Sequence, residues 1–310
     1  MTPFNTLRAG DLVGIVAPAG PALPERLPLV EALFARHGLR VRMYPSCHMT
    51  RGTDEAHGYL AGPDAQRLAD LHAAFADDEV AAVVCLRGGY GAMRLLANVD
   101  VELIRRKPKL LVGYSDITAL HALLHNAGVP SLHGPMPASD LVHAGHEADA
   151  EALFTLLREG MPAGLVMHAG AATALRRAGV CEGPLVGGNL SLVGALSGTP
   201  WAVQAQGAIL FLEDINEEPY RVDRLLCQLR LTGVLAAASG FLLGSFTEGA
   251  APDGVLTEYL HPLGKPVLDA WPAGHGTPNR GLPIGVRARL DATAGTVILL
   301  ESLMQAPRLA

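Results

Sequence analysis

The chain has 310 residues, a length that favours two domains, each large enough to bury its own core. Hydrophobic residues make up 49% of it and charged residues 17%, which is the composition of an ordinary folded protein and argues against disorder. The formal net charge is −6 and the sequence has no basic stripe, so nucleic acid is not expected as a partner.

The cysteines and the apolar segments indicate the compartment. Four cysteines are scattered without CxxC spacing, so we expect neither a disulfide framework nor a zinc site, and Cys85 lies in an apolar run typical of a buried thiol. Asp11 directly precedes the first apolar run and no basic segment leads it, which indicates a first strand rather than a signal peptide. The least polar stretch, 233–246, is shorter than the roughly 20 residues that span a bilayer. We therefore expect a cytoplasmic protein with no membrane partner.

Short apolar runs alternate with amphipathic segments in the N-terminal part of the chain. The predicted strands are Leu12–Ala17, Arg40–Tyr44, Val80–Leu86 and Leu110–Gly113, and the predicted helices are Glu25–His37, Pro63–Asp77 and one that begins at Ala92. The run Val80–Leu86 is almost continuously apolar, as in a parallel strand buried on both faces. This alternation predicts an α/β domain with a doubly wound, mostly parallel sheet, whose ligands bind at the carboxyl ends of the strands.

The remaining sequence predicts a second α/β domain with a more irregular, turn-rich sheet. Its predicted strands are Ala208–Leu212, Gly240–Ser245, Pro266–Leu268 and Thr296–Leu300, and its clear helix is Tyr220–Leu231. The region between the two parts has no strong periodicity beyond one helix, Glu147–Arg158. The expected division is therefore residues 1–137, a crossover over 138–178, and residues 179–310.

Ser115 follows an apolar strand and precedes a helical pattern in the run Gly113-Tyr114-Ser115-Asp116. A serine at such a turn is exposed to substrate, and the amide groups behind it point toward a developing oxyanion, as a nucleophile requires. The usual Gly-x-Ser-x-Gly elbow has a second glycine where this chain has Ile117, which disfavours a standard α/β-hydrolase. The alternative is that Ser115 only caps the following helix.

A serine nucleophile needs a base, and His275 is the best candidate among twelve histidines. Glycines flank it on both sides and a predicted strand precedes it, although a plain surface turn would have the same pattern. His121 and His125 have the i, i+4 spacing of a metal edge. However, they lack the glutamate of HExxH and have no acid or cysteine nearby, so no metal is expected.

The candidate acids lie in the run Leu212–Pro219. Glu213 ends a predicted apolar strand, where a carboxylate emerging at a sheet edge would be partly desolvated and rigidly held. Glu217 precedes the helix Tyr220–Leu231, where an acid is common for helix-dipole reasons alone. Glu213 is therefore the better candidate for orienting a catalytic histidine, and Glu217 the better structural residue.

The glycine-rich run Gly88-Gly89-Tyr90-Gly91 follows a predicted strand. It is not a dinucleotide fingerprint, because Arg94 stands where the third glycine should be, and no cofactor is expected. A phosphate cradle is one use of such a loop. A backbone N–H donor to an oxyanion beside Ser115 fits the same glycines better.

Together these segments resemble the LD-carboxypeptidase family of serine peptidases, which includes the microcin C self-immunity proteins. The matching stretches are LRGGYG at Leu86–Gly91, GYSDIT at Gly113–Thr118, HGP at His133–Pro135, GGNLS at Gly187–Ser191, LEDINEEPYRVDRLLCQL at Leu212–Leu229, GSF at Gly244–Phe246 and GHG at Gly274–Gly276. They span nearly the whole chain in one order. Each would be weak alone.

The resemblance implies a Ser–His–Glu triad at the interface of the two domains. Ser115 would be the nucleophile, His275 the general base and acid, and Glu213 the residue that orients His275. The backbone N–H groups of Asp116 and of the glycine loop, at Gly89, would form the oxyanion hole. The resemblance implies no metal or other cofactor. It does imply a homodimer.

The resemblance also implies the substrate. Family members release the terminal D-alanine from L,D-linked murein tetrapeptides during cytoplasmic peptidoglycan recycling, and the immunity members hydrolyse peptidyl or aminoacyl nucleotides. Two alternatives stay open: that second substrate class, and a two-domain protein that only binds a small molecule in its cleft. The roles of Arg87 and Arg221 toward substrate carboxylates also stay open.

Overall fold

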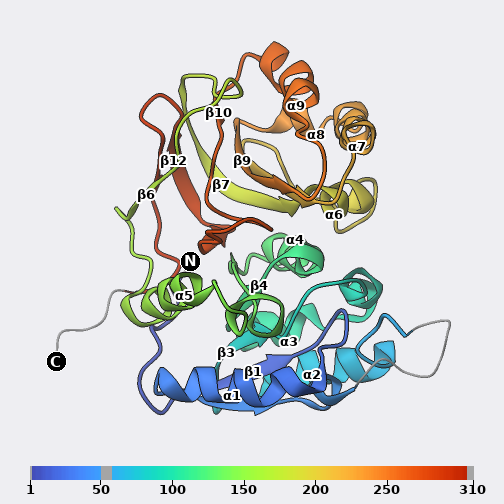
Figure 1. Cartoon of the computed structure of the whole chain (residues 1–310), viewed down its shortest axis with the longest axis vertical. Coiled ribbons are helices and arrows are strands. Elements are labelled where there is room, and N and C mark those ends of the chain that lie inside the picture. The colour runs from blue at the N-terminus through green and yellow to red at the C-terminus, as the bar shows by residue number, and fades with distance from the viewer. Residues whose placement is uncertain (1, 50–57, 306–310) are drawn as a thin grey trace.

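The computed structural model describes residues 2–49 and 58–305, and these form two α/β domains built around two sheets (Figure 1). The first sheet has six strands in the order β11-β5-β4-β3-β1-β2. Their bounds are β1 Leu12–Val16, β2 Arg40–Met43, β3 Val80–Cys85, β4 Leu110–Gly113, β5 Ser131–His133 and β11 Leu282–Ile284. Strands β1 to β5 are parallel and β11 is antiparallel, which confirms a mostly parallel first sheet.

The second sheet has seven strands in the order β10-β9-β8-β7-β12-β13-β6. Their bounds are β6 Val166–His168, β7 Val180–Asn189, β8 Ile209–Ile215, β9 Gly240–Thr247, β10 Val267–Leu268, β12 Arg287–Asp291 and β13 Thr296–Leu299. Strands β7 to β10 are parallel, whereas β12, β13 and β6 add an antiparallel half. The predicted second α/β domain is confirmed.

Helices cover both sheets. They are α1 Leu27–Arg36, α2 Asp64–Ala76, α3 Val101–Arg106, α4 Thr118–Asn126, α5 Glu147–Glu159, α6 Leu190–Leu196, α7 Pro219–Leu231, α8 Val234–Ala237 and α9 Asp253–Leu260. The helix expected from Ala92 is a 3-10 helix over Ala92–Asn98, and α3 begins separately where the Asp100 side chain accepts the N–H of Leu103 at 2.8 Å. No helix in the described residues is long and apolar enough to cross a membrane.

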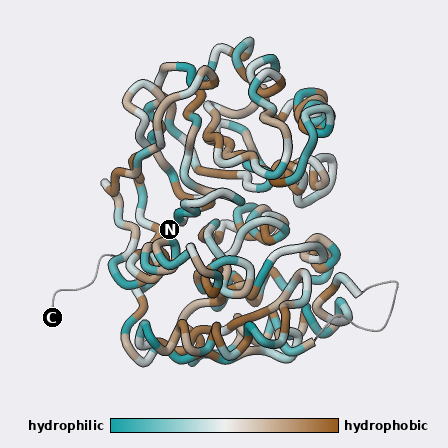
Figure 2. Tube along the Cα trace, viewed as in Figure 1, coloured by the Kyte–Doolittle hydropathy of each residue, from teal (hydrophilic) through white to brown (hydrophobic). Residues whose placement is uncertain are grey.

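The apolar core follows from the strand sequences. Strand β1 is buried along its whole length and β3 at all positions but one, as continuous apolar runs in a parallel sheet require. In Figure 2 brown, hydrophobic segments concentrate inside each domain and teal segments face outward. One buried cluster contains Val83 and Leu120 of the first domain together with Val186 and Leu190 of the second, so the domain boundary is itself part of the core.

Helix α4 lies between the two sheets (Figure 1), and the C-terminal part of the chain also crosses the boundary. Strand β11 pairs with β5, with Leu282 opposite His133 and Ile284 opposite Ser131. Met304 then forms bridges with both Phe4 and Met161. The first sheet therefore includes a strand from beyond residue 280, so the C-terminal segment contributes to both sheets.

Candidate active site

Ser115 lies at the carboxyl end of β4, where the chain turns toward α4. Its φ is 63°, a left-handed conformation that is unfavourable for a residue with a side chain and that concentrates at functional sites. It begins a short 3-10 helix, Ser115–Ile117, that leads into α4. The N-cap positions are Tyr114 and Ile117, and neither helix start has a side-chain cap hydrogen bond. The capping interpretation of Ser115 is therefore wrong.

The glycine loop that follows β3 lies directly against Ser115. A Cβ placed on Gly88 would be 2.9 Å from Ser115 Cβ and 3.0 Å from its Oγ, so this approach requires glycine. The neighbouring Gly89 has φ +110°, which also excludes ordinary side chains. The backbone of the loop is consequently in contact with the serine turn.

Glu213 and His275 form a close pair in the second domain. The Nδ1 of His275 lies 2.7 Å from Oε2 of Glu213, and the His275 backbone N–H donates to the same oxygen at 3.1 Å. A Cβ on Gly274 would come within 2.6 Å of that oxygen, so the flanking glycine lets the histidine loop approach. Since Nδ1 is occupied by the carboxylate, Nε2 is the ring atom left for chemistry.

The position of Glu213 differs from the sequence prediction in one respect. Strand β8 does not end at Leu212 but continues to Ile215, and the Glu213 side chain is fully buried rather than partly desolvated at a sheet edge. A carboxylate at such a depth is stable when it is hydrogen-bonded, and the two bonds from His275 serve this purpose. Its other oxygen, Oε1, has no hydrogen-bond partner among the residues that the structure describes.

The electrostatics of His275 result from opposing effects. Burial lowers the pKa of His275, but the hydrogen bond and charge of Glu213, with further contributions from Asp214 and Asp140, outweigh it and raise the pKa above its usual value of 6.5. A raised pKa means that the imidazolium is stabilised, as a base that accepts a proton during a reaction requires. The pair is thus suited to general base chemistry.

Contacts with Tyr114 bring the histidine to the serine turn. The rings of Tyr114 and His275 lie 4.8 Å apart, and Tyr114 immediately precedes Ser115. Among the described residues no hydrogen bond joins Ser115 Oγ to His275. Catalytic hydrogen bonds are often long or poorly aligned without substrate and tighten when it binds.

Tyr114 is itself held by Asp140, a contact that sequence analysis missed. The Tyr114 hydroxyl donates to Oδ1 of Asp140 at 2.7 Å, and the Met136 N–H donates to the other carboxylate oxygen at 2.8 Å. Next to Tyr114 lies His133, which is fully buried and whose pKa is lowered well below its usual value, chiefly by burial. In the sequence, only the HGP motif, which contains His133, pointed to the residues that surround Tyr114.

The other candidates lie elsewhere. Glu217 accepts from the Ser191 hydroxyl at 3.3 Å and lies 3.7 Å from Arg221, away from His275. His121 uses both ring nitrogens, toward Ser131 Oγ at 2.7 Å and the Gly113 carbonyl at 2.8 Å, so it is not free to bind a metal. No cluster of three metal-ligating side chains occurs in the described part of the chain.

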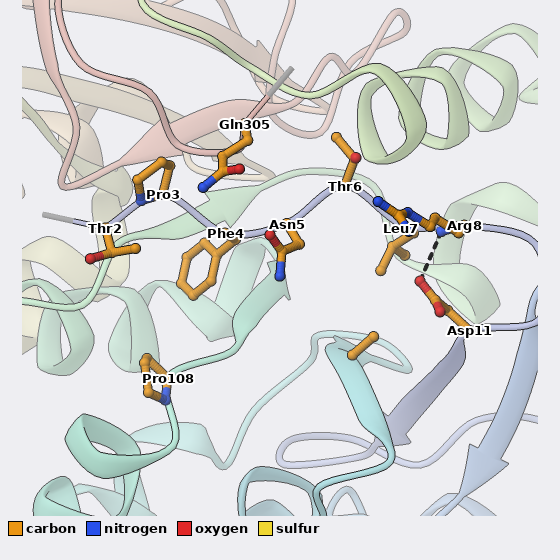
Figure 3. Close-up of a pocket in the computed structure, with 11 residues that line it drawn as sticks. Thr2, Pro3, Phe4, Asn5, Thr6, Leu7, Arg8, Asp11, Pro108 and Gln305 are labelled. Carbon is orange, nitrogen blue, oxygen red and sulfur yellow. Dashed lines mark hydrogen bonds between the residues drawn. The ribbon is translucent and has the colours of Figure 1, made fainter. Parts of the chain in front are cut away.

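A hollow of about 720 Å³ lies away from these residues (Figure 3). It is lined by the N-terminal segment and by Asp11 and Pro108, which precede β1 and β4. It is therefore at the amino ends of these strands, opposite Ser115. Its charged groups are Arg8 and Asp11, whose bond runs from the Arg8 backbone N–H to the carboxylate at 2.8 Å. It has no histidine among its lining residues and carries no comparable chemistry.

Comparison with known proteins agrees with this geometry. Residues 13–134 match the LD-carboxypeptidase N-terminal domain, and residues 182–290 match the LD-carboxypeptidase C-terminal domain. The chain belongs to the LD-carboxypeptidase family. The predicted enzyme class, a carboxypeptidase of a serine peptidase family, is thereby confirmed.

Relatives of known name cover almost the whole chain. A probable murein peptide carboxypeptidase of Bacillus subtilis (strain 168) is 38% identical, over 95% of this chain and 93% of its own. The crystal structure of a muramoyltetrapeptide carboxypeptidase from Oxalobacter formigenes is 30% identical, with a TM-score of 0.82 over 96% of this chain and 100% of its own. The microcin C7 self-immunity protein MccF shares the fold, with a TM-score of 0.85 at 22% identity, over 98% of this chain and 100% of its own.

Proposed function

We propose that this protein is a serine LD-carboxypeptidase that releases the terminal D-alanine from an L,D-linked murein tetrapeptide. The observation that carries the proposal is the Glu213–His275 hydrogen bond of 2.7 Å, made beside the strained turn of Ser115. A histidine oriented by a buried glutamate beside a serine is the arrangement of nucleophilic catalysis, which a protein that only binds a ligand in a cleft does not need.

The proposed reaction assigns one role to each residue. His275 Nε2 takes the proton of the Ser115 hydroxyl while Oγ attacks the carbonyl carbon of the scissile amide. The backbone N–H groups of Asp116 and Gly89 hold the resulting oxyanion. Collapse of the tetrahedral intermediate breaks the C–N bond, and His275 returns the proton to the leaving amine of D-alanine. Water, deprotonated by His275, then hydrolyses the acyl-enzyme.

The relatives support the choice of substrate. Two of them, at 38% and 30% identity, carry names that specify a murein peptide and a muramoyltetrapeptide. From the family resemblance we further infer a place in cytoplasmic peptidoglycan recycling, a homodimeric assembly and a functional division at 1–137, 138–178 and 179–310, with strand β11 of the last segment pairing back onto the first sheet. The catalytic residues would then come from both sides of the crossover.

Mass spectrometry of the product tests the proposal directly. Purified protein is incubated with a murein tetrapeptide that ends in D-alanine and, as a matched control, with the same peptide ending in L-alanine. Release of D-alanine from the first peptide alone, and its loss in Ser115→Ala, is the expected result. A protein that cleaves neither peptide, or a Ser115→Ala variant with substantial residual turnover, would contradict the proposal.

The same experiment tests the alternative substrate class. The shared fold with the MccF protein leaves hydrolysis of an aminoacyl nucleotide as the second possibility, although 22% identity carries the fold alone. An aminoacyl sulfamoyl adenylate is added as a third substrate. Cleavage of this compound without cleavage of the tetrapeptide would assign the chain to the immunity branch.

A further inference from the structure

The side chain of Asp116 reaches the end of the glycine loop. It is 1% exposed, and its Oδ2 accepts the backbone N–H of Ala92 at 2.7 Å. Ala92 follows Gly91 immediately and begins the 3-10 helix Ala92–Asn98. One residue after the candidate nucleophile, the chain is thus bonded to the end of the loop that carries Gly88 and Gly89.

Hydrogen bonds hold the glycine loop on the β1 side of the domain, and the Asp116 carboxylate holds it to the serine turn. The Gly88 carbonyl accepts the Gly20 N–H at 3.1 Å, and the Gly91 carbonyl accepts from Nη1 of Arg67 at 2.9 Å. Arg67 is fully buried and also donates to the Pro18 carbonyl, so both of these contacts fix the loop to the β1 side of the domain. The hydrogen bond from the Ala92 N–H to the Asp116 carboxylate ties the loop to the segment that follows β4 and carries Ser115.

We propose that Asp116 is a positioning residue that couples the two halves of the oxyanion hole. Its backbone N–H is one donor, and its carboxylate fixes, through Ala92, the loop that provides the other donor at Gly89. The inference rests on the proposed function, because it concerns the hole used in that reaction. Asp116 would then act twice: its backbone N–H binds the oxyanion, and its carboxylate positions the glycine loop.

The distances that the hole requires explain why such a coupling matters. Oxyanion donors act at 2.7–3.1 Å from an atom that exists only in the transition state, so a small shift of one donor weakens its contribution. Gly88 already touches Ser115, and therefore the loop cannot move closer. Without the bond to Asp116 the loop keeps its hydrogen bonds on the β1 side, and these do not fix its distance from Ser115. The burial of Asp116 also raises the pKa of its carboxyl to about 6, against the opposing effects of the Ala92 N–H and the Arg67 charge.

Two substitutions separate the hydrogen bond from the charge. Asp116→Ala removes the acceptor and is expected to lower kcat for the tetrapeptide about tenfold to a hundredfold, with KM within about threefold of wild type. Asp116→Asn removes the charge and keeps a side-chain carbonyl oxygen as acceptor for the Ala92 N–H. It is expected to restore kcat to within about fivefold of wild type.

Asp70→Ala is the matched control. Asp70 is also buried in the first domain, and its Oδ2 accepts the Ser46 backbone N–H at 2.6 Å. The Asp70→Ala variant is expected to lose about as much thermal stability as Asp116→Ala and to keep the kcat of wild type. If Asp116→Ala does not fold, Asp116→Ser takes its place, because its hydroxyl is too short to reach Ala92.

A tetrahedral phosphonate inhibitor gives a second measurement, since its adduct on Ser115 places an oxygen in the hole. Inactivation by the phosphonate should slow in Asp116→Ala by about the same factor as kcat. An unchanged kcat in Asp116→Ala, or a rise in KM alone, would overturn the inference. The proposed function itself fails if wild type does not cleave the tetrapeptide or if Ser115→Ala still cleaves it. This outcome is distinct from a failure of the inference on Asp116, which needs an active wild-type enzyme.

Discussion

The hydroxyl oxygen of Thr118 accepts a hydrogen bond from the backbone N–H of Asn189 at 3.0 Å. Thr118 follows Ser115 by three residues and begins α4, whereas Asn189 ends β7 and lies opposite Glu213 in the second sheet. A Cβ on Gly188 would come within 2.5 Å of Thr118 Oγ1, so the two chains could not approach so closely with another residue there. One contact across the domain boundary thus aligns the serine segment with the glutamate strand.

Replacing Thr118 by valine tests this alignment, because the two side chains have the same shape. We expect Thr118→Val to lose about 1–3 kcal/mol of stability through the unpaired Asn189 N–H, and kcat to fall by about tenfold. Urea unfolding and tetrapeptide kinetics measure the two effects. A stability loss with unchanged kcat would show that the contact holds the domains together without aligning the site.

Ser115→Ala and His275→Ala should each remove nearly all turnover, by about 10⁴-fold or more, because members of a triad act as a unit. The double variant should be no less active than either single variant. Ser197→Ala, at a partly exposed serine whose hydroxyl is hydrogen-bonded to Thr232 Oγ1, is the control and should keep full activity. Additive losses in the double variant would mean that the two residues do not serve one step.

The two acids of the same run should behave differently. Glu213→Gln is expected to lose activity strongly, because the neutral amide no longer stabilises the His275 imidazolium that Glu213 faces at 2.7 Å. Glu217→Gln should retain most activity, since Glu217 contacts Ser191 and Arg221. Steady-state kinetics of both variants decide the assignment. The reverse order of activities would mean that Glu217 is the functional acid.

The pH profile should reflect the raised pKa of His275. The base must be neutral to accept the serine proton, so kcat/KM should fall as pH decreases through a pKa above 6.5. Glu213→Gln should move this acidic limb of the residual activity to lower pH, because burial then lowers the pKa of His275 without the opposing charge of Glu213. The raised pKa also contributes folding stability that is complete below the unfolded pKa and lost as pH rises through the folded one. A limb below pH 6 in wild type would contradict the prediction.

Two glycines with positive φ provide a matched test of the histidine loop. Gly274 has φ +110° and a Cβ there would meet Glu213 Oε2 at 2.6 Å, whereas Gly128 has φ +78° and open space around its Cβ position. Both Gly→Ala changes should cost about 1–2 kcal/mol for the backbone conformation. Only Gly274→Ala should also displace the carboxylate and lower kcat. Equal effects on activity would show that the steric contact is unimportant.

The regular parts of the fold follow from the sequence because their residues obey simple periodicities. Runs such as Val80–Leu86 are apolar throughout, and the structure confirms a buried strand over Val80–Cys85. Strand β7 was missed, since Gly183, Pro184, Gly187 and Gly188 interrupt its pattern. These glycines are needed for close contacts with neighbouring backbone and with Thr118, which depend on the tertiary structure and leave no periodic signal.

The site was predictable for a similar reason, but only in part. Ser115 and His275 lie in short motifs whose glycines limit the local conformations, so their positions could be predicted one by one. The pairing of Glu213 with His275 joins residues 62 positions apart and depends on where β8 and the histidine loop meet. The contact of Tyr114 with Asp140 had no counterpart in the sequence, because a buried tyrosine and an acid in a turn are each common.

The pairing of β11 with β5 has a consequence for synthesis on the ribosome. Without Leu282–Ile284, the edge strand of the first sheet has unpaired backbone groups, and the bridges of Met304 to Phe4 and Met161 cannot form. A nascent chain that already carries Ser115 and Glu213 therefore has an unfinished first domain. The strands after residue 280 complete both sheets together, so the first domain is finished only after these residues have been synthesised.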